Sequence, residues 1–200
     1  GGITNITVLG YPEVIGFDTG PGNCLMDCWS RENKIGNYDD KGSWAASGTI
    51  NQSLLETMMN DSYFSRQYPK STGPDYFNHE WIKDKLFRSS LQISPRDIQA
   101  TLLQVTVLSL MNSINSLQLS DQNIYLCGGG IHNELLCKEI NKNCKTEVKT
   151  TAELGIDPDY LEAICFAWLA KQRIDKKSFN LNRITGSKGK VYLGRIYNPS

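Results

Sequence analysis

The chain has 200 residues, of which 40% are hydrophobic, and its 21 basic and 21 acidic side chains leave a formal net charge of zero. This composition is sufficient for a hydrophobic core, and it gives no indication of a polybasic surface of the kind that binds nucleic acid or anionic membranes. No apolar run approaches the ~20 residues that a membrane-spanning helix needs, so neither nucleic acid nor a membrane is an expected partner.

The first predicted element is a β-hairpin. Residues 3–9 alternate between apolar and polar side chains, residues 10–13 have the composition of a turn, and residues 14–17 form a short apolar run. That order predicts two antiparallel strands. The apolar spacing that follows predicts helices at residues 23–35, 50–59 and 80–90, with irregular segments at residues 37–48 and 63–78.

The longest predicted helix begins at Pro95. Ser94 precedes it as an N-cap, and Asp97 places an acid in the first turn, which together make a strong helix start. The apolar stripe continues to about Leu117, so we expect this helix to be central to the fold.

Strands and helices alternate in the last third of the chain. The pattern predicts a buried strand at residues 123–127, a helix at 134–143, a short polar strand at 146–150 and a helix at 158–173 that begins with Asp157 as N-cap. The last helix is expected to bury an apolar stripe made of Leu161, Ile164, Cys165, Trp168 and Leu169. Strands that alternate with helices predict a layered α/β domain.

Six cysteines and two histidines are spread along the chain without a Cys-x-x-Cys pair, so a zinc site is not expected. Most of the cysteines lie within apolar patterns. Buried free thiols are typical of proteins in a reducing compartment, so we expect a cytoplasmic protein.

Asp18 is the residue that most strongly indicates chemistry. It follows an apolar run that ends at Phe17, and it opens the sequence Asp18-Thr19-Gly20-Pro21-Gly22-Asn23. A strand that ends in a tight glycine turn presents its carboxylate at the rim of a sheet, and glycine lets the backbone approach a ligand closely. The alternative is an ordinary surface turn with a solvated aspartate.

Three further patches have the composition of ligand-binding turns. Gly128-Gly129-Gly130 lies between an apolar run and a predicted helix, so its backbone amides could hold phosphate or nucleotide; the alternative is a turn that permits close packing. Gly1-Gly2-Ile3-Thr4-Asn5 could let phosphate approach, or could simply begin a strand. Lys70-Ser71-Thr72-Gly73 could contact an anion, although a lysine in a polar loop is more often solvated.

These patches, together with Phe77-Asn78 and residues 97–103, 155–163 and 166–170, resemble the 1,6-anhydro-N-acetylmuramic acid kinase family. The family belongs to the superfamily of sugar kinases and actin-like ATPases, and the similarity runs from Gly1 to about Pro199. It implies an α/β lobe of the actin-like (ribonuclease H-like) fold with a helical insertion at residues 37–95. Family members begin with another lobe that carries a phosphate loop, so residues 1–200 are expected to be the carboxy-terminal lobe of a two-lobed kinase.

The resemblance implies an ATP-dependent reaction in peptidoglycan recycling. Water opens the 1,6-anhydro bridge of the sugar, and O6 accepts the γ-phosphoryl group to give N-acetylmuramic acid 6-phosphate and ADP. Asp18 is implied as the general base for the water, with the logic of an inverting glycosidase. Substrate contacts are implied for Glu162, Thr19, Gly20, Gly22 and Asn23, and nucleotide contacts for Gly2, Asn5, Gly128, Gly129, Gly130 and Asn133. For Glu162 the alternative is a first-turn acid that complements the helix dipole.

The implied ligands are the sugar and ATP with Mg²⁺, whose protein ligands the sequence does not identify. The implied assembly is a homodimer, and this lobe alone is expected to be inactive. Three alternatives stay open: a lobe that only binds nucleotide or sugar, a kinase for a different sugar, and a glycosidase that uses Asp18 and Glu162 without ATP.

Overall fold

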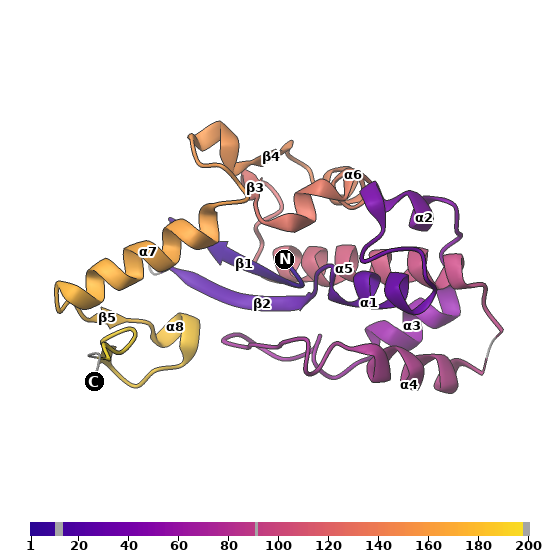
Figure 1. The fold of residues 1–200 in the computed structure, drawn as a ribbon, viewed down its shortest axis with the longest axis horizontal. Helices are drawn as coiled ribbons and strands as arrows, with labels where there is room; N and C mark the ends of the chain where they lie inside the picture. The colour runs from indigo at the N-terminus through magenta and orange to yellow at the C-terminus, as the bar shows by residue number, and fades with distance from the viewer. Residues whose placement is uncertain (11–13, 91, 198–200) are drawn as a thin grey trace.

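The computed structural model describes residues 1–10, 14–90 and 92–197 and shows a mixed α/β fold (Figure 1). Its strands are β1 (Ile3–Val8), β2 (Ile15–Pro21), β3 (Ile124–Leu126), β4 (Val148–Thr150), β5 (Phe179–Asn180) and β6 (Lys190–Val191). Its helices are α1 (Cys24–Glu32), α2 (Ser43–Ala46), α3 (Gln52–Met59), α4 (His79–Ser89), α5 (Pro95–Ser116), α6 (Glu134–Asn143), α7 (Leu161–Ile174) and α8 (Asn182–Thr185). The predicted order of hairpin, helices, strand, helix, strand and helix is confirmed. The turn predicted at residues 10–13 lies mostly outside the described residues.

Strands β1 and β2 form the predicted antiparallel hairpin, but β2 is longer than the sequence suggests. It does not end at Phe17, because Thr4 pairs with Gly20 and Ile3 pairs with Pro21. The main-chain ladder therefore continues through the glycine and the proline to the end of the partner strand. This corrects the expectation of a glycine turn directly after the aspartate: Asp18 lies in the middle of a strand.

Helix α5 is the central helix, as predicted. Ser94 Oγ accepts a hydrogen bond from the Asp97 N–H at 3.3 Å, and Pro95 opens the first turn, so the predicted N-cap is confirmed. Its buried residues include Leu102 and Val105. Helices α1, α2, α3 and α6 pack against it, and so does the hairpin, as Figure 1 shows.

The segment predicted as a loop at residues 37–48 contains a 3₁₀ turn and helix α2. Asp39 organises it, because its buried carboxylate accepts hydrogen bonds from the Trp44 N–H (2.8 Å) and the Ala45 N–H (2.9 Å). So short a polar stretch shows no helical periodicity, which is why the sequence predicts a loop. Helices α2, α3 and α4, which lie within the predicted insertion, contribute to the same hydrophobic core as α5.

Helix α7 begins later than predicted. Asp157 Oδ1 accepts a hydrogen bond from the Asp159 N–H at 2.9 Å, so this side chain closes a turn in place of capping a helix at Pro158. The helix starts at Leu161, after Tyr160. An aspartate followed by proline satisfies both patterns, and the sequence alone does not separate them.

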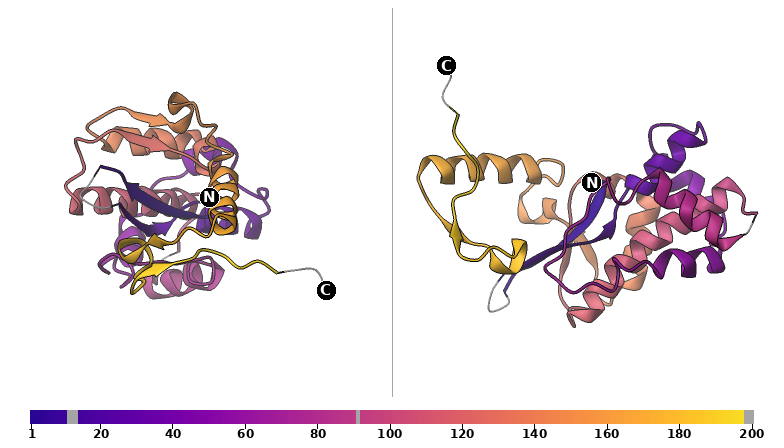
Figure 2. Two further views of the ribbon diagram at one scale, coloured as in Figure 1. Left: turned by 90° about the vertical axis from the view of Figure 1, so that its left-hand side faces the viewer. Right: turned by 90° about the horizontal axis from the view of Figure 1, so that it is seen from below.

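The apolar stripe that was predicted to be buried on α7 is largely exposed. Ile164 and Cys165 are exposed, Trp168 is 48% exposed, and Leu161 and Leu169 are half-buried. Figures 1 and 2 show the reason: α7 stands apart from α5, beside the short C-terminal segments β5 and α8. The predicted buried strand β3 is also only half-buried, because β4 is its one partner in a parallel two-stranded sheet.

All six cysteines are unpaired, which confirms free thiols, but none of them is fully buried. The expectation of buried thiols is therefore wrong. Among the described residues no group of three or more histidine, cysteine, aspartate or glutamate side chains is arranged to hold a metal ion. Within the same part of the chain, no helix combines the length and the apolar character that crossing a membrane requires.

Candidate active site

Asp18 is the one half-buried residue in β2, since the other residues of that strand are buried. Its partner across the hairpin is Asn5, an exposed residue of β1, and the register shifts between Thr4 and Asn5. Residues opposite each other in an antiparallel pair project to the same face. Register irregularities of this kind re-aim side chains and are common next to active sites. The structure thus places the predicted base beside one predicted nucleotide contact.

The loop between α3 and α4 holds Asp18 from one side. Ser71 Oγ and the Thr72 N–H each donate a hydrogen bond to Asp18 Oδ2 at 2.9 Å. The Asp18 N–H donates to Lys70 O at 3.1 Å, and the Tyr63 hydroxyl donates to Asp18 O at 2.9 Å. Both the backbone and the carboxylate of Asp18 are therefore fixed by this loop.

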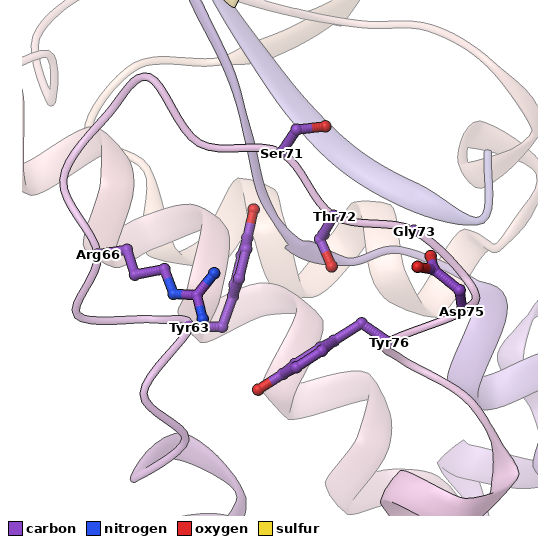
Figure 3. A pocket seen from close by; sticks show the side chains of 7 residues that line it. All are labelled: Tyr63, Arg66, Ser71, Thr72, Gly73, Asp75 and Tyr76. Carbon is purple, nitrogen blue, oxygen red and sulfur yellow. The ribbon is translucent and has the colours of Figure 1, made fainter.

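The same loop lines a cavity of about 390 Å³ (Figure 3). Its lining residues are Tyr63, Arg66, Ser71, Thr72, Gly73, Asp75 and Tyr76. Figure 3 shows the Arg66 and Tyr63 side chains on one side and that of Asp75 on the other, with Thr72 between them and the Tyr76 ring reaching back toward Tyr63. A cavity of this size can accept a small-molecule group. Two of its lining residues, Ser71 and Thr72, are the residues that donate hydrogen bonds to the carboxylate of Asp18.

A buried carboxylate, that of Asp61, anchors the loop. It accepts hydrogen bonds from the Tyr63 N–H (3.0 Å) and the Tyr76 hydroxyl (2.7 Å). Trp81 Nε1 donates a third at 2.9 Å, and Lys85 Nζ forms an ion pair with it at 2.8 Å. Burial by itself raises the pKa of Asp61, but these hydrogen bonds outweigh burial and lower the pKa to about 2.

Tyr63 and Lys70 connect this anchor to Asp18. Burial, and then the negative charge of Asp18, raise the pKa of Tyr63, so its hydroxyl stays a hydrogen-bond donor. Lys70 Nζ donates to Tyr63 O (3.3 Å) and Phe64 O (3.5 Å) and lies 4.7 Å from the centre of the Tyr63 ring. Burial, and then the positive charge of Arg66, lower the pKa of Lys70. Lys70 is half-buried, and its ammonium group is held against the loop.

The start of the chain, the end of β2 and the glycine cluster after β3 meet in one place. The Gly22 N–H donates to Gly2 O at 2.8 Å. A Cβ on Gly22 would lie 2.6 Å from Gly1 O, and one on Gly128 would lie 3.2 Å from Gly1 N. Gly22 therefore needs to be glycine for close backbone approach, and Gly128 needs to be glycine because its φ is +78°. Gly129 differs, because a Cβ there would have no neighbour within 4 Å, so its backbone faces open space.

The residues that follow the aspartate in β2 and α1 differ in their surroundings. Thr19 is 1% exposed, and its hydroxyl donates to Thr4 O at 3.2 Å. A Cβ on Gly20 would lie 2.8 Å from the Phe64 ring, so Thr19 and Gly20 pack inside the protein. Asn23 Oδ1 is buried without a hydrogen-bond partner among the described residues.

Asn133 and Glu162 lie near the glycine cluster but not in the cavity beside Asp18. Asn133 Oδ1 accepts the Leu136 N–H at 3.0 Å and caps α6. Glu162 is exposed in the first turn of α7. The turn before that helix is tied to the cluster by a hydrogen bond of 2.9 Å from the Gly128 N–H to Pro158 O. The turn that precedes Glu162 therefore adjoins the predicted nucleotide patch.

Comparison with known proteins adds an independent observation. The family model described as anhydro-N-acetylmuramic acid kinase matches residues 1–199. The chain belongs to the anhydro-N-acetylmuramic acid kinase family. This confirms the resemblance drawn from the glycine patches.

Named members of the anhydro-N-acetylmuramic acid kinase family align with nearly the whole chain. Identity is 46% over 201 residues to the protein of that name from Coxiella burnetii (strain Dugway 5J108-111), and 43% over 210 residues to that from Haemophilus influenzae. It is 40% over 199 residues to that from Pseudomonas savastanoi pv. phaseolicola. Each alignment covers 98% of this chain but 54% or 55% of the relative. The chain spans about half the length of the curated relatives it matches.

The sequence did not reveal the donors that hold Asp18 in this member of the anhydro-N-acetylmuramic acid kinase family. Tyr63, Ser71 and Thr72 lie 45, 53 and 54 residues after it, and no spacing rule connects positions so far apart. The stretch Lys70-Ser71-Thr72-Gly73 is the signal that the sequence offers, but its lysine is the residue that suggests a ligand contact. The hydroxyl and amide groups after that lysine make the contacts.

Proposed function

We propose that residues 1–200 form the carboxy-terminal lobe of an ATP-dependent kinase that opens 1,6-anhydro-N-acetylmuramic acid and phosphorylates O6. The products are N-acetylmuramic acid 6-phosphate and ADP. In this proposal the lobe has an actin-like (ribonuclease H-like) fold, and residues 37–95 are an insertion. One observation carries the proposal. The half-buried carboxylate of Asp18 is held at Oδ2 by two hydrogen bonds, and it lies on the hairpin whose end meets the glycine cluster.

Asp18 serves as the general base in this reaction. Its carboxylate takes a proton from a water molecule as the water oxygen bonds to the anomeric carbon, and the bond from that carbon to O6 breaks. O6 then takes the γ-phosphoryl group, so the leaving oxygen needs no proton. The proton stays on Asp18 until it passes to solvent. Asn5, opposite Asp18 on β1, is suited to donate a hydrogen bond to the transferring group.

The glycine cluster fits the nucleotide. Phosphoryl transfer depends on positioning the phosphates and neutralising their charge, and backbone amides of glycine turns supply part of both. Open space at Gly129 leaves room for phosphate or ribose against the backbone. We assign the nucleotide contacts to this patch, with Gly2, Gly130 and Asn133 beside it. The proposed nucleotide is ATP with Mg²⁺, the cation that phosphoryl transfer normally uses, and we assign no protein ligand to the metal.

The Gly129→Ala substitution tests the nucleotide assignment. The new methyl has open space in the unliganded protein, so the melting temperature should not change. The methyl group would crowd a bound nucleotide at a cost of about 1–3 kcal/mol of binding free energy. ATP affinity should therefore fall roughly tenfold or more in isothermal titration. Gly189→Ala, which also has open space, is the matched control and should keep wild-type affinity. Unchanged ATP affinity in Gly129→Ala would contradict the assignment.

The reaction itself is tested on the full-length protein that carries this sequence. We expect ADP release to require 1,6-anhydro-N-acetylmuramic acid, and mass spectrometry should find one phosphoryl group and one added water in the product. Sugar opening without ATP would support a glycosidase. ADP release with another amino sugar only would indicate a different substrate, and ligand binding without any product would indicate a non-catalytic lobe.

We further propose a homodimer in the cytoplasm. The cytoplasmic assignment is supported by six unpaired cysteines, which suit a reducing compartment. The dimer is proposed only because the family resemblance implies it, and a molecular mass measured by light scattering on the full-length protein tests it.

A further inference from the structure

Asp18 has an asymmetric set of partners. Both hydrogen bonds to its carboxylate end on Oδ2, one from Ser71 Oγ and one from the Thr72 N–H, and each measures 2.9 Å. The other oxygen, Oδ1, takes neither of them. Since the two oxygens of a free carboxylate are equivalent, these donors decide which oxygen is held by the loop and which is left for another partner.

The aspartate torsion that sets this orientation is weakly constrained by itself. The last side-chain torsion of aspartate is broad and roughly two-fold, so external donors must fix the carboxylate plane. A general base works only within hydrogen-bond reach of the proton that it abstracts. The donors on Oδ2 therefore control how well Oδ1 is aimed.

The two donors differ in what else they do. The Thr72 N–H belongs to the main chain of a loop that is fastened to β2 by the hydrogen bond from the Asp18 N–H to Lys70 O. Ser71 is exposed, and the one hydrogen bond that its hydroxyl donates goes to Asp18. Its hydroxyl is thus free of a packing role, and its contribution can be removed without opening the core.

We propose that Ser71 is a positioning residue: its hydroxyl, with the Thr72 amide, holds Asp18 Oδ2 so that Oδ1 faces the water that attacks the anhydro-sugar. This inference rests on the proposed function. In this proposal Ser71 affects catalysis through Asp18 and not through a contact with the sugar or the water.

The test uses Ser71→Ala in the full-length kinase. We expect kcat for the anhydro-sugar to fall about 10- to 100-fold, the loss expected for one hydrogen bond to a charged group. The KM for ATP and the melting temperature should stay at wild-type values. Ser71→Thr, which keeps a hydroxyl, should restore most of kcat. Ser65→Ala is the matched control, because this exposed serine lies in the same loop and donates to Ser62 O at 3.0 Å.

A double-mutant cycle separates this proposal from the function on which it rests. In the Asp18→Asn background, Ser71→Ala should cause no further loss, because there is no longer a base to aim. Wild-type kcat in Ser71→Ala, with Asp18→Asn inactive, would overturn the positioning role and leave the function standing. An equal loss in both backgrounds would also overturn it, since the hydroxyl would then act directly on the substrate. Full activity of Asp18→Asn would instead remove the proposed function.

Discussion

The Asp18→Asn variant of the full-length kinase is expected to lose turnover almost completely. The amide keeps the shape of the side chain and can still accept the hydrogen bonds from Ser71 and Thr72, but it cannot take a proton from water. Loss of a general base lowers kcat by about 10²–10⁴-fold. ATP affinity should be nearly unchanged, because the glycine cluster and not this carboxylate is assigned to the nucleotide. Steady-state kinetics with the anhydro-sugar and titration with ATP measure the two quantities.

Asp84→Asn is the matched control for this experiment. It makes the same change in a carboxylate on α4 whose ion pair with Arg88, at 2.9 Å, is exposed. We expect wild-type kcat for this control. If Asp18→Asn retained more than a tenth of the wild-type kcat, the assignment of Asp18 as base would be wrong.

The second large effect is expected from substitution of Asp61, which anchors the loop that carries Ser71, and it is a loss of unfolding free energy. In the Asp61→Asn variant the Lys85 ammonium group stays buried without its counter-ion. Removal of one partner from a buried ion pair costs about 3–5 kcal/mol of unfolding free energy. Urea denaturation of the 200-residue chain measures this loss. Asp84→Asn, which breaks an exposed pair, should cost less than about 1 kcal/mol.

A compensating substitution shows whether the stranded charge causes the loss. Adding Lys85→Met to Asp61→Asn removes the buried charge, so the double variant should recover part of the lost stability. No recovery would mean that the hydrogen bonds from Tyr76 and Trp81 to Asp61 dominate.

The pKa of Asp61 adds an acid-dependent part to the same prediction. Its folded-state pKa of about 2 lies below its usual value of 3.8. A lowered pKa stabilises the folded state above the unfolded-state value, so this contribution is complete above about pH 4 and is lost as pH falls toward 2. The difference in stability between wild type and Asp61→Asn should narrow over that range.

The sequence predicted best where the physical cause is local. Ser94 followed by Pro95 fixes the start of α5 through a hydrogen bond between residues only three positions apart, Ser94 and Asp97. The N-cap could therefore be predicted from the sequence. The same holds for the hairpin and for α6, because strand alternation and helical spacing each depend on near neighbours.

Predictions failed where a distant partner decides the outcome. The ladder with β1 extends β2 through Gly20, whereas the local glycine pattern predicts a turn. The stripe of α7 has the spacing of a buried face, but burial depends on what packs against the helix. The donors to Asp18 come from a loop more than 50 residues away, which no local pattern describes.

A crystal structure of the full-length kinase with bound 1,6-anhydro-N-acetylmuramic acid tests the central claim most directly. It should show Asp18 Oδ2 accepting hydrogen bonds from Ser71 Oγ and the Thr72 N–H. Asp18 Oδ1 should lie within hydrogen-bond reach of a water molecule beside the anomeric carbon. An anomeric carbon too far from Asp18 for one water to bridge would contradict the account.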